Sequence, residues 1–298
     1  MPRRDYVAAM HLRPGDADLP VWYGAALGDS GDAAGALRAF DKALELDPNH
    51  FAAHMNRGKV LADLGRYPEA AAACDRAIAL DPANGVARDG RCWVRAVIGR
   101  DLPGALDDCD RAIAAMPGAA NPLNNRGLVH FRMGRMSESI ADYTASIEAD
   151  PGMVSSYYVR SLARSAQGDG AAADRDLAEA LATADGVINT TPVGMAKFPG
   201  TPVPAALLRP ELWVAEIIYF PLETELLRVA RSLGCRTLDG GGMAVFQAVD
   251  AFRLITGAEP DAQRMQRHAG VDAFVIRDNG AGFDMRYRDN LLDRKSVV

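Results

Sequence analysis

Two asparagines, Asn56 and Asn125, occupy equivalent positions in two copies of a repeated sequence pattern. A side-chain amide both donates and accepts hydrogen bonds, so amides at repeated positions suit recognition of a polypeptide backbone. Cationic and aromatic side chains stand near them in the sequence. The candidate binding residues are Asn56, Arg57, Lys59, Asn124, Asn125, Phe131, Arg132, Tyr157 and Arg160. For any single polar residue among them, the alternative is a solvated helix face without a ligand.

The repeated pattern is marked by a helix-ending segment that closes on proline. Its copies end at Pro48, Pro82, Pro117 and Pro151, which are 34, 35 and 34 residues apart. Proline cannot continue a helix, because it lacks an N–H group and its ring clashes with the preceding turn. A period of about 34 residues closed by proline is typical of a repeated helix-turn-helix unit.

Small residues recur at fixed offsets inside each unit, where two helices must approach closely. Gly24, Gly58, Gly127 and Ser161 take the first such position, and counting back from the closing proline places Trp93 there in the third unit. The turns between helices fall at Gly31, Gly65, Gly134 and Gly168. On each second helix, a small residue and a larger one four positions later share one face: Ala36 with Phe40, Ala70 with Cys74, Ala105 with Cys109, Ser139 with Tyr143, and Ala173 with Leu177.

This pattern resembles the tetratricopeptide repeat (TPR) family over residues 17–183, in five units. The resemblance implies that residues 1–183 form an α-helical solenoid whose first helices line a groove that binds an unidentified protein or peptide. Members that capture C-terminal carboxylates use several groove lysines and arginines, whereas Lys59 is the only groove lysine here, so that subtype is disfavoured. The alternative is an alanine-rich helical bundle with accidental spacing.

After Ala184 the sequence changes to short β-branched runs that alternate with helical segments. Strands are predicted at residues 186–189, 212–219 and 236–238, and helices at residues 222–233, 243–256 and 261–268. Alternation of strands and helices indicates parallel pairing. Residues 184–268 are therefore predicted to form a small, incomplete α/β subdomain of Rossmann-like type.

Three ordered motifs stand in this part of the chain. They are Asn189-Thr190-Thr191-Pro192-Val193-Gly194-Met195, Tyr219-Phe220-Pro221-Leu222-Glu223-Thr224 and Asp239-Gly240-Gly241-Gly242-Met243-Ala244-Val245-Phe246-Gln247-Ala248. Together they resemble the C-terminal part of shikimate or quinate dehydrogenases. The resemblance implies that a group of residues lies beside the nicotinamide of NADP or NAD: Asn189, Thr191, Pro192, Gly194, Met195, Gly242 and Met243. It also implies that Tyr219 and Gln247 lie near a hydroxy-acid substrate.

Two parts of such an enzyme are missing from the sequence. No G-x-G-x-x-G turn, which would hold the pyrophosphate at a helix N-terminus, precedes Asp185. The repeats also stand where the family has an N-terminal substrate domain with a lysine and an aspartate that manage the proton. No catalytic residue is therefore assigned and no cofactor is expected, and the motif residues are predicted to be inherited packing and turn residues.

The composition disfavours several other classes of protein. The net charge is −6, and residues 1–183 hold 20 basic and 25 acidic side chains, without the clustered positive excess of a nucleic-acid binder. No apolar run reaches the ~20 residues of a membrane span, and no signal-like segment follows Met1, so a cytoplasmic protein is expected. The four cysteines lack paired spacing and predict reduced, buried thiols without a metal site.

Residues 269–298 are predicted to be a disordered tail. Residues 274–285 within it resemble the Asp-x-Gly-x-Gly box of histidine-kinase-type ATPases, in which the aspartate meets the adenine amino group. The function predicted for the whole chain is a scaffold for protein–protein interaction that carries a degenerate dehydrogenase segment. The alternative is an NADP- or NAD-dependent shikimate or quinate dehydrogenase, and a nucleotide-binding signalling fragment is a third alternative.

Overall fold

The computed structural model describes residues 3–195, 197–218, 221 and 223–240. Contacts divide the chain into two compact units, Met1–Ala173 and Asp174–Val298, which we call the repeat unit and the sheet unit. No helix in the described residues is both long enough and apolar enough to cross a membrane.

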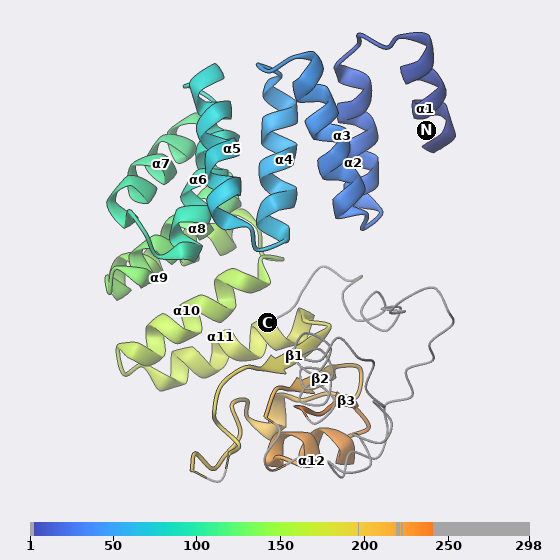
Figure 1. Cartoon of the computed structure of the whole chain (residues 1–298). Helices are drawn as coiled ribbons and strands as arrows, with labels where there is room; N and C mark the ends of the chain where they lie inside the picture. The colour runs from blue at the N-terminus through green and yellow to red at the C-terminus, as the bar shows by residue number, and fades with distance from the viewer. Residues whose placement is uncertain (1–2, 196, 219–220, 222, 241–298) are drawn as a thin grey trace, which may run out of the picture. The chain divides into compact units, whose positions relative to one another are not determined.

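Successive helices of the repeat unit pack against one another in pairs, α2 on α3, α4 on α5, α6 on α7 and α8 on α9 (Figure 1). Their bounds are α1 Arg3–Leu12, α2 Asp18–Asp29, α3 Ala33–Leu46, α4 Phe51–Asp63, α5 Tyr67–Leu80, α6 Gly85–Ile98, α7 Leu102–Ala115, α8 Ala120–Arg132, α9 Met136–Ala149 and α10 Val154–Ala166. The next helix, α11 (Gly170–Thr183), crosses the division between the units. The predicted array of helix pairs is confirmed.

Helix α1 extends the repeat pattern by half a unit that the sequence analysis missed. Pro14 follows α1 and lies 34 residues before Pro48, so α1 corresponds to the second helix of a repeat. Its Tyr6 is half-buried and its ring lies 6.0 Å from that of Tyr23 in α2.

The turn inside each helix pair places glycine in the left-handed region, which side chains rarely adopt. The φ angles are 84° at Gly31, 72° at Gly65, 73° at Gly99, 75° at Gly134 and 85° at Gly168. In the third unit one extra residue follows this glycine, and Asp101 takes it up with a φ of 51°. Asp101 then caps α7 by accepting a hydrogen bond from the N–H of Gly104 at 3.2 Å.

This extra residue corrects one sequence prediction. Counting back from Pro117 placed Trp93 at the small-residue position of the third unit, but the insertion shifts that position to Cys92, 34 residues after Gly58. Cys92 is fully buried, whereas Trp93 is half-buried. The same correction adds Gly99 to the turn glycines.

The prediction of reduced thiols is wrong for Cys92 and Cys109, which form a disulfide with their Cα atoms 5.5 Å apart. The reason lies in the repeat geometry, because the small residue of each first helix faces the larger residue of its partner helix. A Cβ added to Gly24 would lie 2.6 Å from the Phe40 ring, and in the third unit both of these positions are cysteine. Cys74 and Cys235 are free and buried, as predicted.

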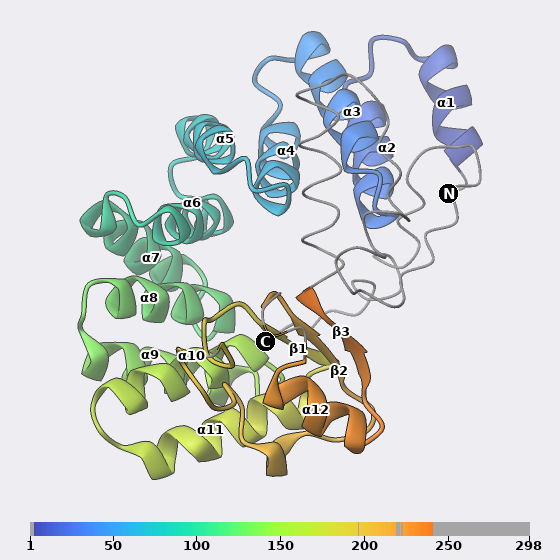
Figure 2. The same cartoon turned by 60° about the horizontal axis from the view of Figure 1, so that its bottom comes forward.

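Among its described residues, the sheet unit has a parallel sheet of three strands in the order β1-β2-β3: β1 is Gly186–Asn189, β2 is Trp213–Glu216 and β3 is Arg236–Leu238. Helix α12 (Glu225–Ser232) lies against β2 and β3 (Figure 2), and a short 3-10 helix, η1, spans Ala205–Leu207. Leu181 of α11 joins Val187, Val214 and Leu226 in one apolar cluster. The predicted strands are confirmed, although β2 is shorter than predicted. The helices predicted at 243–256 and 261–268 and the predicted tail lie outside the described residues.

Candidate functional site

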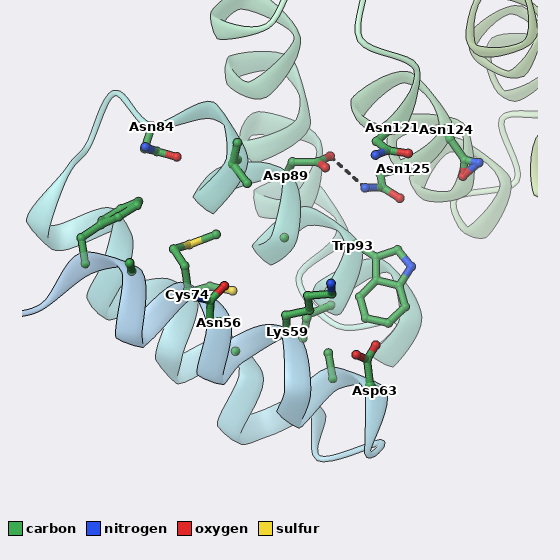
Figure 3. Close-up of a pocket in the computed structure, with 18 of the residues that line it drawn as sticks. Asn56, Lys59, Asp63, Cys74, Asn84, Asp89, Trp93, Asn121, Asn124 and Asn125 are labelled. Atoms are coloured by element: carbon green, nitrogen blue, oxygen red, sulfur yellow. Dashed lines mark hydrogen bonds between the residues drawn. The ribbon is translucent and has the colours of Figure 1, made fainter. Parts of the chain in front are cut away.

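The repeat unit carries an open hollow of about 670 Å³, formed by the first helices α4, α6 and α8 and by the start of α10 (Figure 3). We call it the asparagine hollow. Its lining residues are Phe51, Ala52, Met55, Asn56, Gly58, Lys59, Ala62, Asp63, Cys74, Asn84, Val86, Asp89, Gly90, Trp93, Val94, Asn121, Asn124, Asn125, Met153 and Ser155. The first helices of successive units thus line the surface, as the sequence predicted.

Side-chain amides from several helices reach this hollow. Asn125 is buried, and its Nδ2 donates to Oδ1 of Asp89 at 2.8 Å. Asn124 donates to the hydroxyls of Ser155 and Ser156, each at 3.1 Å. Asn56 is half-buried, and its side chain has no hydrogen-bond partner in the part of the chain that the structure describes. The amide of Asn56 is therefore available to a ligand, whereas that of Asn125 already donates to Asp89.

Asp89 is a half-buried carboxylate that faces Asn125 (Figure 3). Burial raises its pKa, and the hydrogen bond from Asn125 opposes that rise. Within the described residues Asp89 has no cationic partner. One helical turn further along α6, Trp93 lines the same hollow and makes an edge-on contact with Tyr67, with ring centroids 6.1 Å apart.

Apolar side chains and two opposite charges complete the lining. Phe51, Met55 and Val86 supply apolar surface. Lys59 and Asp63 are both exposed, and neither forms an ion pair among the described residues. The hollow thus combines apolar surface, amides and a few unpaired charges, which is the usual make-up of a site that binds an organic ligand.

The structure brings together Asn56, Lys59, Asn124 and Asn125 from the predicted groove set, but it places the others elsewhere. Arg57 donates from Nε to Oδ1 of Asp41 at 2.8 Å. Arg132 is exposed and donates to the carbonyl of Val97 at 3.3 Å. Phe131 is half-buried away from the hollow lining, and Arg160 lies over the ring of Tyr157 at 5.5 Å.

Arg57 and Arg160 belong to a periodic series that the sequence analysis missed. The series is Arg57, Arg91, Arg126 and Arg160, spaced 34, 35 and 34 residues apart. Each member donates to the second helix of the preceding unit: to Asp41 at 2.8 Å, Asp75 at 2.7 Å, Asp110 at 2.8 Å and Thr144 at 3.0 Å respectively. We call this series the arginine ladder, and it ties neighbouring units together.

Asp108 of α7, which is fully buried, accepts hydrogen bonds from three arginines of α6. Arg91 donates hydrogen bonds to both carboxylate oxygens of Asp108, from Nε at 2.7 Å and from Nη2 at 2.6 Å. Arg88 and Arg95, also from α6, donate to the same carboxylate at 3.3 and 2.8 Å. Side-chain hydrogen bonds to Asp108 raise the pKa of Arg91, so its guanidinium group stays protonated.

Sequence reasoning missed Asp89 and Trp93 as lining residues because the third unit was read one residue out of register. With Cys92 in the small-residue position, Trp93 corresponds to Lys59, 34 residues earlier. The glycine repeat at Gly99 was the signal that could have given this register. In the described residues, no group of three His, Cys, Asp or Glu side chains could hold a metal ion.

In the sheet unit, the residues implied to lie beside a nicotinamide form a loop that bonds to itself. Asn189 is buried at the end of β1, and its Nδ2 donates to the carbonyl of Val193 at 2.8 Å. Its Oδ1 accepts from the N–H of Thr191 at 2.9 Å and from the Thr191 hydroxyl at 2.7 Å. The polar atoms of Asn189 are thus used inside the loop.

Gly194 of the same loop has a backbone conformation that favours glycine. Gly194 has a φ of 114°, and a Cβ there would lie 3.3 Å from Ile218. Pro192 is exposed and Met195 is half-buried. Gly242, Met243, Tyr219 and Gln247 lie outside the described residues.

Comparison with known proteins identifies the repeats. Tetratricopeptide repeat models match residues 24–85 and 120–153. Residues 41 to the end of MamA from Desulfovibrio magneticus RS-1 are 20% identical, with a TM-score of 0.50, covering 56% of this chain and 94% of that one. A thermophilic TPR protein of Thermus thermophilus is 20% identical, with a TM-score of 0.50, covering 57% and 92%. The chain carries tetratricopeptide repeats.

Dehydrogenases are also similar to part of the chain. Shikimate dehydrogenase (NADP(+)) of Streptomyces avermitilis is 68% identical over 101 residues, which are 33% of this chain and 35% of that protein. Quinate/shikimate dehydrogenase (NAD(+)) of Corynebacterium efficiens is 58% identical over 92 residues, 31% and 32% respectively. The chain thus spans about a third of the length of these relatives. It carries a shikimate/quinate dehydrogenase-like segment.

Proposed function

We propose that this chain is a scaffold for protein–protein interaction and that the asparagine hollow binds a polypeptide segment of the partner. The observation that carries the proposal is the convergence of Asn56 and Asn125 on one hollow with apolar surface around them. An extended polypeptide presents N–H and C=O groups in alternation, and an amide side chain satisfies either kind. The apolar surface beside the amides would contact alternate side chains of the ligand.

A test of this proposal begins by selecting peptides from a random displayed library on the full-length protein. Dissociation constants of the selected peptides are then measured by fluorescence anisotropy. The variant Asn56→Ala/Asn125→Ala is expected to weaken binding by roughly 30-fold, because each lost hydrogen bond contributes ~1 kcal/mol. Glu138→Ala, an exposed change on the second helix α9, serves as the control and should leave affinity unchanged. Equal affinities of all three proteins would place binding outside the hollow.

The second candidate function is NADP- or NAD-dependent oxidation of shikimate or quinate, favoured by the 68% identity to part of a shikimate dehydrogenase. Two observations weigh against a dinucleotide site. Asn189 is 2% exposed, and its amide is occupied by Val193 and Thr191. No Gly-rich pyrophosphate turn precedes β1 in the sequence. We therefore propose that this segment is a degenerate part of a dehydrogenase.

Two measurements separate the candidates. A ligand that binds the folded state raises the melting temperature. If the segment does not bind a dinucleotide, NADP or NAD should leave the melting temperature unchanged. Absorbance of the reduced cofactor should also show no turnover of shikimate or quinate above background. Turnover that disappears in a Gln247→Ala variant would establish the enzyme and overturn the proposed degeneracy.

A further inference from the structure

Asp89 and Trp93 lie four residues apart on α6 and both line the asparagine hollow. Residues at this spacing lie on the same side of a helix, with Cβ atoms about 6 Å apart. Asn125 holds Oδ1 of Asp89 at 2.8 Å and thereby fixes the orientation of the carboxylate. A carboxylate and an indole ring, one turn apart, thus face the same open space.

The arginines of α6 do not pair with Asp89. The three arginines of this helix, Arg88, Arg91 and Arg95, all donate to Asp108 on α7. Among the described residues, Asp89 on the same helix receives one hydrogen bond from a neutral amide and none from a cation. A half-buried carboxylate without a cation is costly, and its raised pKa reflects that cost.

We propose that Asp89 and Trp93 form a binding site for an arginine side chain of the bound polypeptide. A guanidinium group donates to a carboxylate in a planar fork and stacks on an aromatic ring, so both members of the pair recognise it. A lysine would pair with Asp89 but would lack the planar stack on Trp93. This inference rests on the proposed function, because it names the ligand chemistry of the same hollow.

The surrounding charges favour a basic ligand. Lys59 and Asp63 lie one helical turn apart on α4 and contribute opposite charges to the lining. With Asp89, the net charge of these three lining residues is −1. Residues 1–183 carry 20 basic and 25 acidic side chains, a net charge of −5, so the longer-range field also attracts a cationic segment.

The test compares peptide selections and affinities for the full-length wild type, Asp89→Asn and Asp107→Asn. Asp89→Asn keeps an oxygen that can accept from Asn125. Asp107→Asn removes the same charge from an exposed site on α7 outside the hollow and is the control. Wild-type selections should be enriched in arginine at one position. Asp89→Asn should weaken the binding of such a peptide by about 10-fold or more, since hydrogen bonds to charged groups are stronger than neutral ones, and Asp107→Asn should change the affinity less than about 2-fold.

A second arm changes the peptide in place of the protein. Replacing the selected arginine by glutamine should weaken wild-type binding by at least the factor seen for Asp89→Asn, because it also removes the stack on Trp93. Adding Asp89→Asn to the altered peptide should then weaken binding little further. Peptides bound at the hollow without any arginine preference would overturn this inference and leave the proposed function standing. Failure to select any peptide sensitive to Asn56→Ala/Asn125→Ala would overturn both.

Discussion

Arg91 of α6 and Asp108 of α7 form a two-point ion pair, with N–O distances of 2.7 and 2.6 Å, around a carboxylate that is fully buried. The same guanidinium reaches Asp75 of the preceding unit at 2.7 Å. One side chain therefore joins the two helices of its own unit and also binds them to the previous unit.

Asp108→Asn should destabilise the protein by about 3–5 kcal/mol, because it removes the fully buried counter-charge that Arg88, Arg91 and Arg95 share. The free energy of unfolding is measured by urea titration with far-UV circular dichroism. Asp107→Asn is the neighbouring control, since Asp107 is 58% exposed in its pair with Arg111 and its loss should cost less than about 0.5 kcal/mol. Equal midpoints for the two variants would contradict the structural role of Asp108.

The Cys92–Cys109 disulfide should stabilise the repeat unit by about 3 kcal/mol, the value expected for a closed loop of 17 residues. A reductant should lower the melting temperature of the wild type but not that of Cys92→Ala/Cys109→Ala. Thiol titration of the unreduced, denatured protein should find the thiols of Cys74 and Cys235 only. Detection of all four thiols would show that the disulfide does not form.

Gly24→Ala should cost about 1–3 kcal/mol, because its Cβ would lie 2.6 Å from the Phe40 ring and overpack the first helix pair. Gly28→Ala, one turn along the same helix, is the control. Its Cβ would meet Val60 at 3.7 Å, an ordinary contact, and alanine favours a helix by up to about 1 kcal/mol over glycine. Phe40→Leu should recover part of the Gly24→Ala loss. Similar stabilities of the two alanine variants would refute the close approach.

Burial raises the pKa of the Cys74 thiol to about 11, from an ordinary value of 9.0. Between these two pKa values the folded state keeps the thiol proton while the unfolded state loses it. The contribution of Cys74 to the free energy of unfolding is therefore complete below pH 9.0 and is lost as the pH rises to about 11. The difference in the free energy of unfolding between the protein with Cys74 and its Cys74→Ala variant should shrink over this pH range. Both proteins carry Cys92→Ala/Cys109→Ala to prevent disulfide exchange, and Tyr143, whose pKa burial also raises, is common to both. A constant difference would contradict the shift.

The repeat fold could be predicted because backbone rules leave local marks. Pro48 and Pro82 end helices, and Gly31 and Gly65 take a conformation that other residues avoid, so their period reveals the helix pairs. The register of the third unit could not be read from Pro117, because Asp101 adds one residue before α7. The spacing of Gly99 from Gly65, 34 residues, keeps the correct register.

The candidate site was predicted less well than the fold. Asn56 and Asn125 were found because equivalent positions of a repeat share a face. Arg57 looked like a groove residue, but whether an arginine points to solvent or to Asp41 on the neighbouring helix depends on packing between units. The pairing of Cys92 with Cys109 likewise requires knowledge of which helix faces meet.

The arginine ladder also bears on where unfolding of the array would start. In a linear array, stability is a sum of the intrinsic terms of the repeats and the coupling terms between neighbours. Arg57 donates to the exposed Asp41 alone within the described residues, whereas Arg91 and Arg126 also hold the buried Asp108 and Asp142. The contacts to Asp108 and Asp142 lie within their own helix pairs, so they raise the intrinsic stability of the third and fourth units. Amide hydrogens of α2 to α4 should therefore exchange with deuterium before those of α6 to α9.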